Sequence, residues 1–234
     1  MPAHALILAA GRGERLRPWT DTCPKPLLDV GGRRLIEWHL EALARAGVRE
    51  VVINTAWLEE QFEPALGDGA RWGLRIRYSH EGRDHGGALE TAGGIAKALP
   101  WLGERFWVVS GDVFVPGFGF DAAAVQDFDA SGAAGHLWMV PNAPHHPQGD
   151  FGIDEGGHLS PAAQPRRTWA SLGLFRAALF SDITPGSRLA LRPVLDAALS
   201  QRQLTGQAWD GHWTDVGTPE RWALAQAWAA GRPA

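Results

Sequence analysis

Short, wholly apolar segments recur through the first half of the 234-residue chain, separated by segments with helical periodicity. The apolar segments cover 5–10, 51–53 and 106–109, and Ser110 ends the last of these predicted strands. Strands that are apolar on both faces are typical of a parallel sheet covered by helices on both sides. Between the first two, residues 35–46 have apolar side chains at helical spacing, and the pattern stops at Gly47, a typical helix end. This alternation predicts a mostly parallel α/β sheet with helices on both faces.

The second half of the chain is less regular. We expect antiparallel strands at 151–153 and 171–175, because both are short and apolar and lie between turn-forming residues. Pro219 favours the first position of a final helix, which runs to about residue 229. Further elements are predicted as helices at 58–66, 90–99 and 189–202 and as strands at 74–78 and 136–140. The expected class is therefore α/β, with a Rossmann-like mixed, mostly parallel central sheet and a small antiparallel region.

Composition and charge narrow the possible functions. The net charge is −4 and the pI about 6.1, whereas proteins that bind nucleic acid through its backbone are usually more basic. Cys23 is the only cysteine, so no intrachain disulfide forms and a reducing compartment fits. The sequence shows no signal peptide, and no apolar run approaches the ~20 residues that span a bilayer. We expect a cytoplasmic protein that binds neither nucleic acid nor membranes.

A glycine-containing loop with the sequence LAAGRGERLRP, residues 8–18, follows the first predicted strand. Glycines at 11 and 13 let backbone N–H groups approach phosphate oxygens. Leu16 replaces the third glycine of a dinucleotide fingerprint and no Gly-Lys-Ser/Thr follows, which disfavours a dehydrogenase or a Walker A loop. Alone, the loop fits an ordinary strand–turn equally well. A second cationic element, Lys25 held between Pro24 and Pro26, favours a phosphate site.

Two aspartates are candidates for holding a metal ion. Asp112 directly follows a buried strand, and ligands of open α/β sheets bind outside the carboxyl ends of strands. A carboxylate there suits Mg²⁺, although a turn or helix-cap aspartate is the alternative. Asp215 lies in a turn before Pro219, where Thr218 is a natural helix N-cap. The two aspartates are far apart in the chain, so the sequence does not show whether they meet.

Residues 8–27 resemble the pyrophosphorylase consensus of sugar-1-phosphate nucleotidylyltransferases, LAAGxGxRLxPxT followed by PKPL, with every position filled. The resemblance implies transfer of a nucleoside monophosphate from an NTP to a sugar 1-phosphate, with release of pyrophosphate. It implies that Arg15 and Lys25 are the catalytic cations. It also implies that Asp112 and Asp215 hold the Mg²⁺ cofactor. Such chemistry needs positioned charge more than proton transfer, so no general base is required.

The resemblance also implies how the nucleotide is bound. The glycine loop would wrap the triphosphate. Residues 89–94, which follow a mobile-looking polar stretch at 81–87, resemble the family's base-contacting element. The alternative for 89–94 is a first helical turn with glycines for packing. The residues implied to bind the nucleotide are Leu8, Ala9, Ala10, Gly11, Gly13, Glu81, Thr91 and Gly93.

A narrower resemblance concerns the sugar. Residues 141–152 resemble the Asn-x-Pro-His-His-Pro-x-Gly-Asp-Phe segment of N-acetylmuramate 1-phosphate uridylyltransferases, and 54–58 resemble the Asn-x-Ala-Trp-Leu of that subgroup. This implies UTP and N-acetylmuramic acid 1-phosphate as substrates, used in peptidoglycan recycling. Asn142, Gly149 and Asp150 are then expected to bind the sugar phosphate. A mannose-1-phosphate guanylyltransferase, another hexose-1-phosphate nucleotidylyltransferase and a catalytically inactive nucleotide-sugar-binding module remain alternatives.

A chain of 234 residues suits one large α/β domain, so we expect a single domain over 1–234, with 1–115 mainly binding the nucleotide and 116–234 mainly binding the sugar phosphate. The state is expected to be a monomer or a homodimer. A Glu-Lys-Pro element that contacts sugar in glucose-1-phosphate enzymes is missing, and 164–167 reads Gln-Pro-Arg-Arg instead, which disfavours glucose 1-phosphate. The adjacent His145 and His146 have no third ligand nearby in the sequence, which disfavours zinc.

Overall fold

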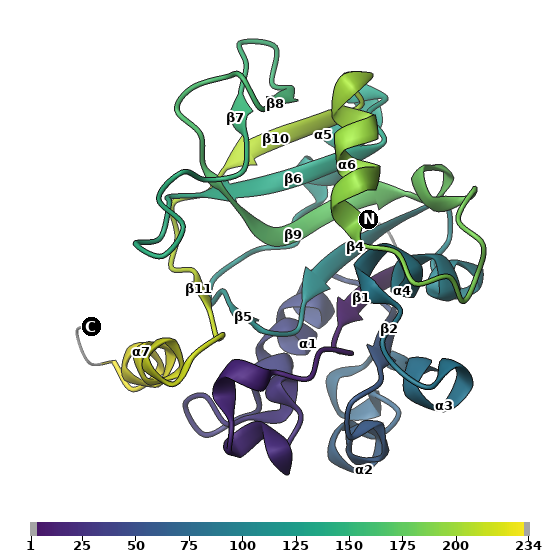
Figure 1. The fold of residues 1–234 in the computed structure, drawn as a ribbon, viewed down its shortest axis with the longest axis vertical. Helices are drawn as coiled ribbons and strands as arrows, with labels where there is room; N and C mark the ends of the chain where they lie inside the picture. Colours follow the sequence, from purple (N-terminus) through teal and green to yellow (C-terminus); the bar gives the residue numbers. More distant parts are fainter. Residues whose placement is uncertain (1–3, 232–234) are drawn as a thin grey trace.

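A seven-stranded mixed sheet forms the centre of the protein in the computed structural model, which describes residues 4–231 (Figure 1). Its strands are β1 (His4–Leu8), β2 (Glu50–Thr55), β3 (Arg75–His80), β4 (Arg105–Ser110), β6 (Gly135–Val140), β9 (Thr168–Arg176) and β10 (Leu204–Ala208). They lie in the order β10-β6-β9-β4-β1-β2-β3. β9 is antiparallel to both of its neighbours, and all other neighbouring pairs are parallel. The predicted mixed, mostly parallel sheet is confirmed.

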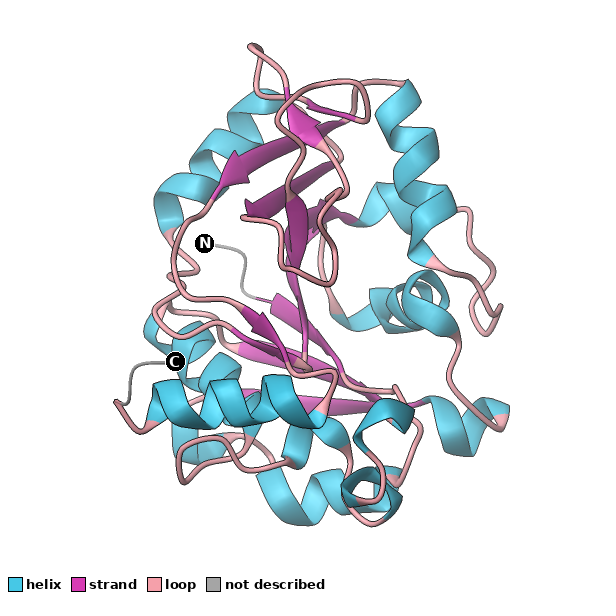
Figure 2. Cartoon of the chain, turned by 60° about the vertical axis from the view of Figure 1, so that its left-hand side comes forward, coloured by secondary structure: helices cyan, strands magenta, loops and turns pink. Residues whose placement is uncertain are grey.

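Helices cover both faces of this sheet (Figure 2). They are α1 (Leu35–Arg45), α2 (Phe62–Leu66), α3 (Glu81–His85), α4 (Glu90–Ala98), α5 (Ala122–Ser131), α6 (Leu191–Ser200) and α7 (Pro219–Ala229). Side chains alternate along a strand, so the apolar residues of β1 pack against helices on both faces of the sheet. Ala5 and Ile7 pack in the cluster that contains α1, α2 and α5, whereas Leu6 packs in the cluster that contains α4 and α6. All three are fully buried, as the apolar run predicts.

Two small antiparallel ribbons extend from the main sheet. β5 (Val113–Phe114) pairs with β11 (Thr214–Asp215), and β7 (Gly152–Ile153) pairs with β8 (Leu159–Ser160). The antiparallel strands expected at 151–153 and 171–175 are therefore present as β7 and part of β9, each with other partners. The β5–β11 ribbon matters most for the site, because it joins the segment after β4 to the segment before α7.

The structure departs from the sequence prediction where few apolar residues mark an element. α5 buries only Val125 and Phe128, β10 buries only Leu204, and neither was predicted. The stretch 81–87, expected to be irregular, contains the short helix α3. The helix expected over 58–66 is reduced to α2 after a 3-10 turn. The final helix and its Thr218 cap are confirmed, since the Thr218 side chain accepts from the first turn of α7.

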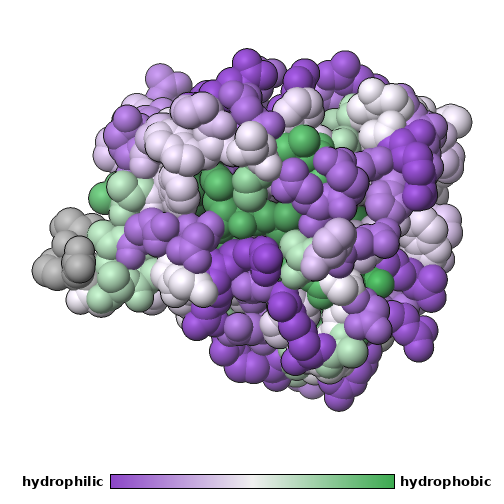
Figure 3. All heavy atoms as spheres, turned by 90° about the horizontal axis from the view of Figure 1, so that it is seen from below, coloured by the Kyte–Doolittle hydropathy of each residue, from purple (hydrophilic) through white to green (hydrophobic). Residues whose placement is uncertain are grey.

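The surface is hollowed on the face seen from below, where apolar residues lie inside a rim of hydrophilic ones (Figure 3). Within residues 4–231, every helix is too short or too polar to cross a bilayer.

Candidate active site

A cavity of about 290 Å³ opens at the carboxyl ends of β1, β2 and β4. Ligands of open α/β sheets bind at this edge, outside the carboxyl ends of the strands. The lining residues are Leu8, Ala9, Ala10, Gly11, Lys25, Pro26, Asn54, Glu81, Ala88, Glu90, Thr91, Ser110 and Asp112. We call this space the first cavity.

Six of the eight residues expected to bind the nucleotide line the first cavity, namely Leu8, Ala9, Ala10, Gly11, Glu81 and Thr91. The other two lie beside it. Gly13 accepts a hydrogen bond from Thr20 Oγ1 at 2.9 Å, which folds the glycine loop onto the turn that leads to Lys25. The N–H of Gly93 donates to Leu189 O at 3.1 Å, so this glycine packs α4 against the segment before α6. Gly93 thus takes the packing role that the sequence left open.

Lys25 and Asp112 face each other in the first cavity. Lys25 Nζ donates to Asp112 Oδ2 at 2.7 Å, and Ser110 Oγ donates to Asp112 Oδ1 at 2.7 Å. The Lys25 residue is only 8% exposed, so the ammonium is held in place. Burial acts to raise the pKa of Asp112, but the charge and hydrogen bond of Lys25 outweigh it, and the pKa lies below its ordinary value. Asp112 is therefore a carboxylate at neutral pH.

The β5–β11 ribbon brings the second aspartate to the first. Asp215 pairs with Val113, and the N–H of Val216 donates to Asp112 O at 2.8 Å. Asp215 Oδ2 lies 2.9 Å from Arg221 Nη2. The backbones of the two aspartates thus run side by side, a meeting that the sequence could not show.

Arg15 joins this region through a close approach at Gly217. A Cβ at position 217 would lie 2.2 Å from Arg221 Nη2, 2.9 Å from Arg15 Nη2 and 3.2 Å from Asp215 Oδ2. The two guanidinium groups and the carboxylate can gather there only because residue 217 has no side chain. Arg15 thus approaches Asp215 at Gly217, but the ion-pair partners of Asp215 are Arg221 and His145, whereas Lys25 is paired directly with Asp112.

The two aspartates offer carboxylate oxygens of the kind that a hard divalent metal ion such as Mg²⁺ prefers. No group of three or more His, Cys, Asp or Glu side chains is placed to bind a metal within residues 4–231. Mg²⁺ does not need such a cage, since it is usually held by one or two carboxylates together with phosphates and water. Asp215 Oδ1 is buried, and His145 Nε2 lies 3.2 Å from it. Carboxylate oxygens suit a hard cation.

The residues expected to bind the sugar phosphate lie apart from the first cavity. Asn142 Nδ2 donates to Arg166 O at 3.0 Å, and Asn142 Oδ1 accepts from Thr168 Oγ1 at 2.9 Å. Gly149 O accepts from Arg166 Nη2 at 3.1 Å, and Asp150 Oδ2 accepts from the N–H of Trp169 at 2.8 Å. These bonds attach the loop 141–150 to the start of β9, so each of the three residues shapes the loop.

A second cavity, of about 520 Å³, lies beside Asp215. Its polar lining includes His145, whose Nε2 is 3.2 Å from Asp215 Oδ1, together with His212 and Arg221. Its apolar lining is Val140, Pro141, Ala143, Pro144, Trp213 and Leu224. The β5–β11 ribbon connects the two cavities, because Asp112 lines the first and Asp215 lines the second.

Sequence reasoning missed several residues of these cavities as site residues, among them Asn54, Ser110, His145 and Arg221. Asn54 and Ser110 are polar residues at the carboxyl ends of buried strands, the same signal that identified Asp112. The other two depend on how the loop 141–150 and the start of α7 fold toward Asp215, for which the sequence holds no local signal.

A family model described as nucleotidyl transferase matches residues 4–229. The chain belongs to this family. It is therefore a nucleotidyltransferase, as the glycine loop and the lysine between two prolines predict.

Individual relatives agree with this assignment. The chain is 47% identical over 236 residues to the N-acetylmuramate alpha-1-phosphate uridylyltransferase of Neisseria meningitidis serogroup B, covering 96% of this chain and 99% of the relative. It is 31% identical over 234 residues to the mannose-1-phosphate guanylyltransferase of Mycobacterium tuberculosis, covering 95% of this chain and 63% of that protein. A Bacillus anthracis protein solved in complex with sucrose has the same fold, with a TM-score of 0.81 at 21% identity over 99% of this chain and 97% of that one.

Proposed function

We propose that this nucleotidyltransferase transfers UMP from UTP to N-acetylmuramic acid α-1-phosphate, giving UDP-N-acetylmuramic acid and pyrophosphate. The observation that carries the proposal is the 47% identity, over nearly the full length of both chains, to the Neisseria relative of that name. The reaction would serve peptidoglycan recycling in the cytoplasm. UTP would occupy the first cavity, whose lining runs from Leu8 to Asp112, and the sugar phosphate would lie toward the second half of the chain.

The proposed reaction is an in-line displacement at the α-phosphorus of UTP. A phosphate oxygen of the sugar 1-phosphate forms the new P–O bond, and the bond to the β-phosphate breaks, so that the electron pair leaves with pyrophosphate. The attacking oxygen is already an anion at neutral pH, and no proton needs to be removed. The protein's task is to hold two anions together and to stabilise the charge that builds up on the leaving group.

Lys25 and Arg15 supply this stabilisation. Asp112 holds the Lys25 ammonium at 2.7 Å, so this cation is preorganised, and the exposed Arg15 approaches the site at Gly217. Asp112 and Asp215 would also hold Mg²⁺, which when bound neutralises charge on the phosphate oxygens. Asp112 therefore orients Lys25, Asp215 is paired with Arg221, and both carboxylates would offer oxygen ligands to the metal.

A pyrophosphate-release assay of UTP, CTP, ATP and GTP against four sugar 1-phosphates tests the proposal. The sugars are N-acetylmuramic acid, N-acetylglucosamine, glucose and mannose, each as the 1-phosphate, with MgCl₂ or EDTA. We expect turnover with UTP and N-acetylmuramic acid 1-phosphate and none in EDTA. Preference for GTP with mannose 1-phosphate would overturn the substrate assignment. Tight binding of UDP-sugars without any turnover would indicate an inactive binding module instead.

A further inference from the structure

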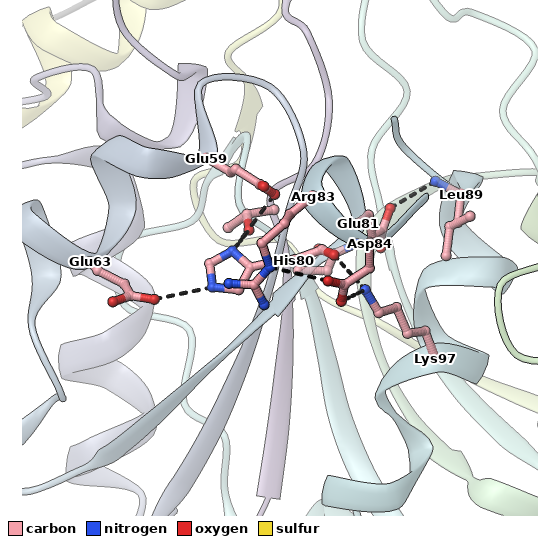
Figure 4. A network of polar contacts seen from close by, with 10 residues as sticks. Glu59, Glu63, His80, Glu81, Arg83, Asp84, Leu89 and Lys97 are labelled. Carbon is pink, nitrogen blue, oxygen red and sulfur yellow. Dashed lines mark hydrogen bonds and ion pairs between the residues drawn. The ribbon is translucent and has the colours of Figure 1, made fainter. Parts of the chain in front are cut away.

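A continuous chain of hydrogen bonds crosses the first cavity. The N–H of Ala9 donates to Asn54 Oδ1 at 2.7 Å. Asn54 Nδ2 donates to Glu81 Oε1 at 2.7 Å. The N–H of Leu89 donates to Glu81 Oε2 at 2.8 Å, as the dashed line in Figure 4 shows. We call the two side chains in the middle the Asn54–Glu81 bridge.

The bridge connects two walls of the first cavity that are far apart in the sequence. Ala9 belongs to the glycine-loop wall, with Leu8 and Gly11. Leu89 precedes Glu90 and Thr91, which line the opposite wall. Since the bridge bonds to backbone N–H groups on both sides, it sets the spacing of the two walls rather than the position of one side chain.

Both side chains of the bridge are buried, so breaking one of its hydrogen bonds costs free energy. Asn54 is 3% exposed and Glu81 is fully buried. Removing one partner of a buried hydrogen bond leaves the other unsatisfied, which costs more than the bond itself contributes. Both Glu81 oxygens already accept hydrogen bonds from the protein, so this carboxylate acts through the two walls.

An independent packing feature supports the same conclusion. A Cβ at position 94 would lie 2.5 Å from Glu81 Oε1 and 2.7 Å from Asn54 Nδ2. α4 therefore packs directly onto the bridge through a residue that has no side chain. Glycine lowers the stability of a helix interior, so its presence in α4 is explained by this contact.

We propose that Asn54 and Glu81 are positioning residues for UTP, which hold the glycine loop and the 88–91 wall at the spacing that the nucleotide requires. The inference rests on the proposed function, because it takes UTP as the occupant of the first cavity. In this proposal Glu81 affects nucleotide binding through the bridge rather than by direct contact, and Asn54 shares that positioning role.

The direction of each hydrogen bond provides the test. In Glu81→Gln, one donor always faces another donor, however the two side-chain amides at 54 and 81 are turned. In Asn54→Asp, a second carboxylate faces Glu81. In the double variant Asn54→Asp/Glu81→Gln, the new carboxylate accepts from both the Ala9 N–H and the new amide, whose carbonyl still accepts from the Leu89 N–H. The double variant restores every bond with the net charge unchanged.

The experiment measures the KM for UTP, the KM for the sugar 1-phosphate and kcat, together with the equilibrium Kd for UTP by calorimetry. We expect each single variant to raise the KM and Kd for UTP by about 10-fold or more, the effect of one unsatisfied buried group. The KM for the sugar phosphate should stay within about twofold, and the double variant should recover to within about threefold of wild type, since its bonds are restored. A role in stability alone would lower the active fraction and leave the KM for UTP unchanged.

Thr205→Val is the matched control. It removes the contact of Thr205 Oγ1 with His136 Nδ1 at 2.9 Å, between β10 and β6 at the far end of the sheet. We expect a lower melting temperature with an unchanged KM for UTP. If a single variant does not fold, Gly94→Ala displaces the bridge from outside while favouring the helix, and it should also raise the KM for UTP.

Three outcomes overturn the inference. The first is an unchanged KM for UTP in the folded single variants, and the second, if those variants do not fold, is an unchanged KM for UTP in a folded Gly94→Ala variant. The third is a folded double variant whose KM for UTP is not restored. The last would mean that Glu81 contacts the nucleotide directly. A wild-type protein that binds UTP but releases no pyrophosphate with any sugar phosphate would contradict the proposed function alone, because the Kd series still tests the bridge. A wild-type protein that does not bind UTP would contradict both.

Discussion

The two sides of the site hold their residues by different means. On the amino-terminal side, the ends of β1, β2 and β4 present Leu8, Asn54 and Asp112 directly to the first cavity. On the carboxyl-terminal side, Asn142 and Asp150 use their polar atoms to attach a loop to β9. Asn54 and Asp112 use their polar atoms to join parts of the cavity lining to one another, whereas Asn142 and Asp150 use theirs to fix a loop outside the first cavity. We call the two the strand-held side and the loop-held side. A polar side chain at a strand end can therefore brace the cavity itself, whereas one in the loop braces the loop.

The largest expected effect is on the strand-held side. Lys25→Ala removes the ammonium that neutralises phosphate charge and leaves Asp112 without its partner. We expect kcat to fall by about 100-fold or more, as for the loss of one preorganised charge contact. Arg192→Ala is the control, because it deletes a cation from an exposed ion pair with Asp196 and should leave the rate unchanged. Equal rates for wild type and Lys25→Ala would show that the strand-held side does not carry the chemistry.

A second prediction compares the stability of the two sides. Each contains one histidine that is shielded from water: the buried His39 on α1, whose Nε2 lies 2.9 Å from Val113 O, and the half-buried His136 on β6. Burial is the main cause that lowers the pKa of each to about 4 from 6.5. Below pH 6.5 the two histidines bind protons in the unfolded chain but stay neutral in the folded protein. The free energy of unfolding therefore falls as the pH falls from about 6.5 to about 4. From pH 7 to pH 5 each histidine should cost about 2 kcal/mol.

Urea unfolding at pH 7 and pH 5 measures this effect. Wild type should lose stability at pH 5, and His39→Gln and His136→Gln should each remove a similar part of that loss. One transition, affected alike by both substitutions, would indicate that the two sides unfold as one unit despite their different construction. If the free energy of unfolding of wild type is the same at both pH values, the burial argument is wrong.

A smaller effect is expected on the loop-held side. Asp150→Ala removes the acceptor for the Trp169 N–H at the start of β9. Losing this bond should loosen the loop by about 1 kcal/mol and raise the KM for the sugar 1-phosphate about fivefold, with the KM for UTP unchanged. Asp154→Ala is the matched control, since Asp154 also accepts backbone N–H bonds, in the turn between β7 and β8. A change in the KM for UTP instead would place the loop 141–150 against the nucleotide.

The strand-held side was largely predictable from the sequence. The fully apolar run 5–10 predicts a buried parallel strand, and the glycine loop after it and Asp112 after β4 then fall at the same edge of the sheet. Lys25 was identified by its two flanking prolines together with that loop. These signals are local or follow from the direction of parallel strands, so the sequence contains them.

The remaining contacts join segments that are far apart in the chain. Asp112 and Asp215 meet through a ribbon of two-residue strands, too short to produce a sequence pattern. Asn54 depends on the Glu81 contact, and Gly94 is needed because of both. Loop geometry decides what Asn142 touches. Such contacts arise only once the sheet has brought the segments together, and no local propensity encodes them.

The smallest predicted effect concerns the start of α7, which contacts Asp215 where the strand-held and loop-held sides meet. Thr218 caps this helix by accepting from the N–H of Arg221, and Arg221 in turn contacts Asp215. Thr218→Ala should lower the free energy of unfolding by about 1 kcal/mol, and Thr218→Ser should restore most of it. kcat should change less than about twofold, because the β5–β11 ribbon still holds Asp215 beside Asp112. If kcat instead falls by 10-fold or more at full folding, the helix rather than the ribbon positions Asp215, and the second carboxylate belongs with the loop-held side.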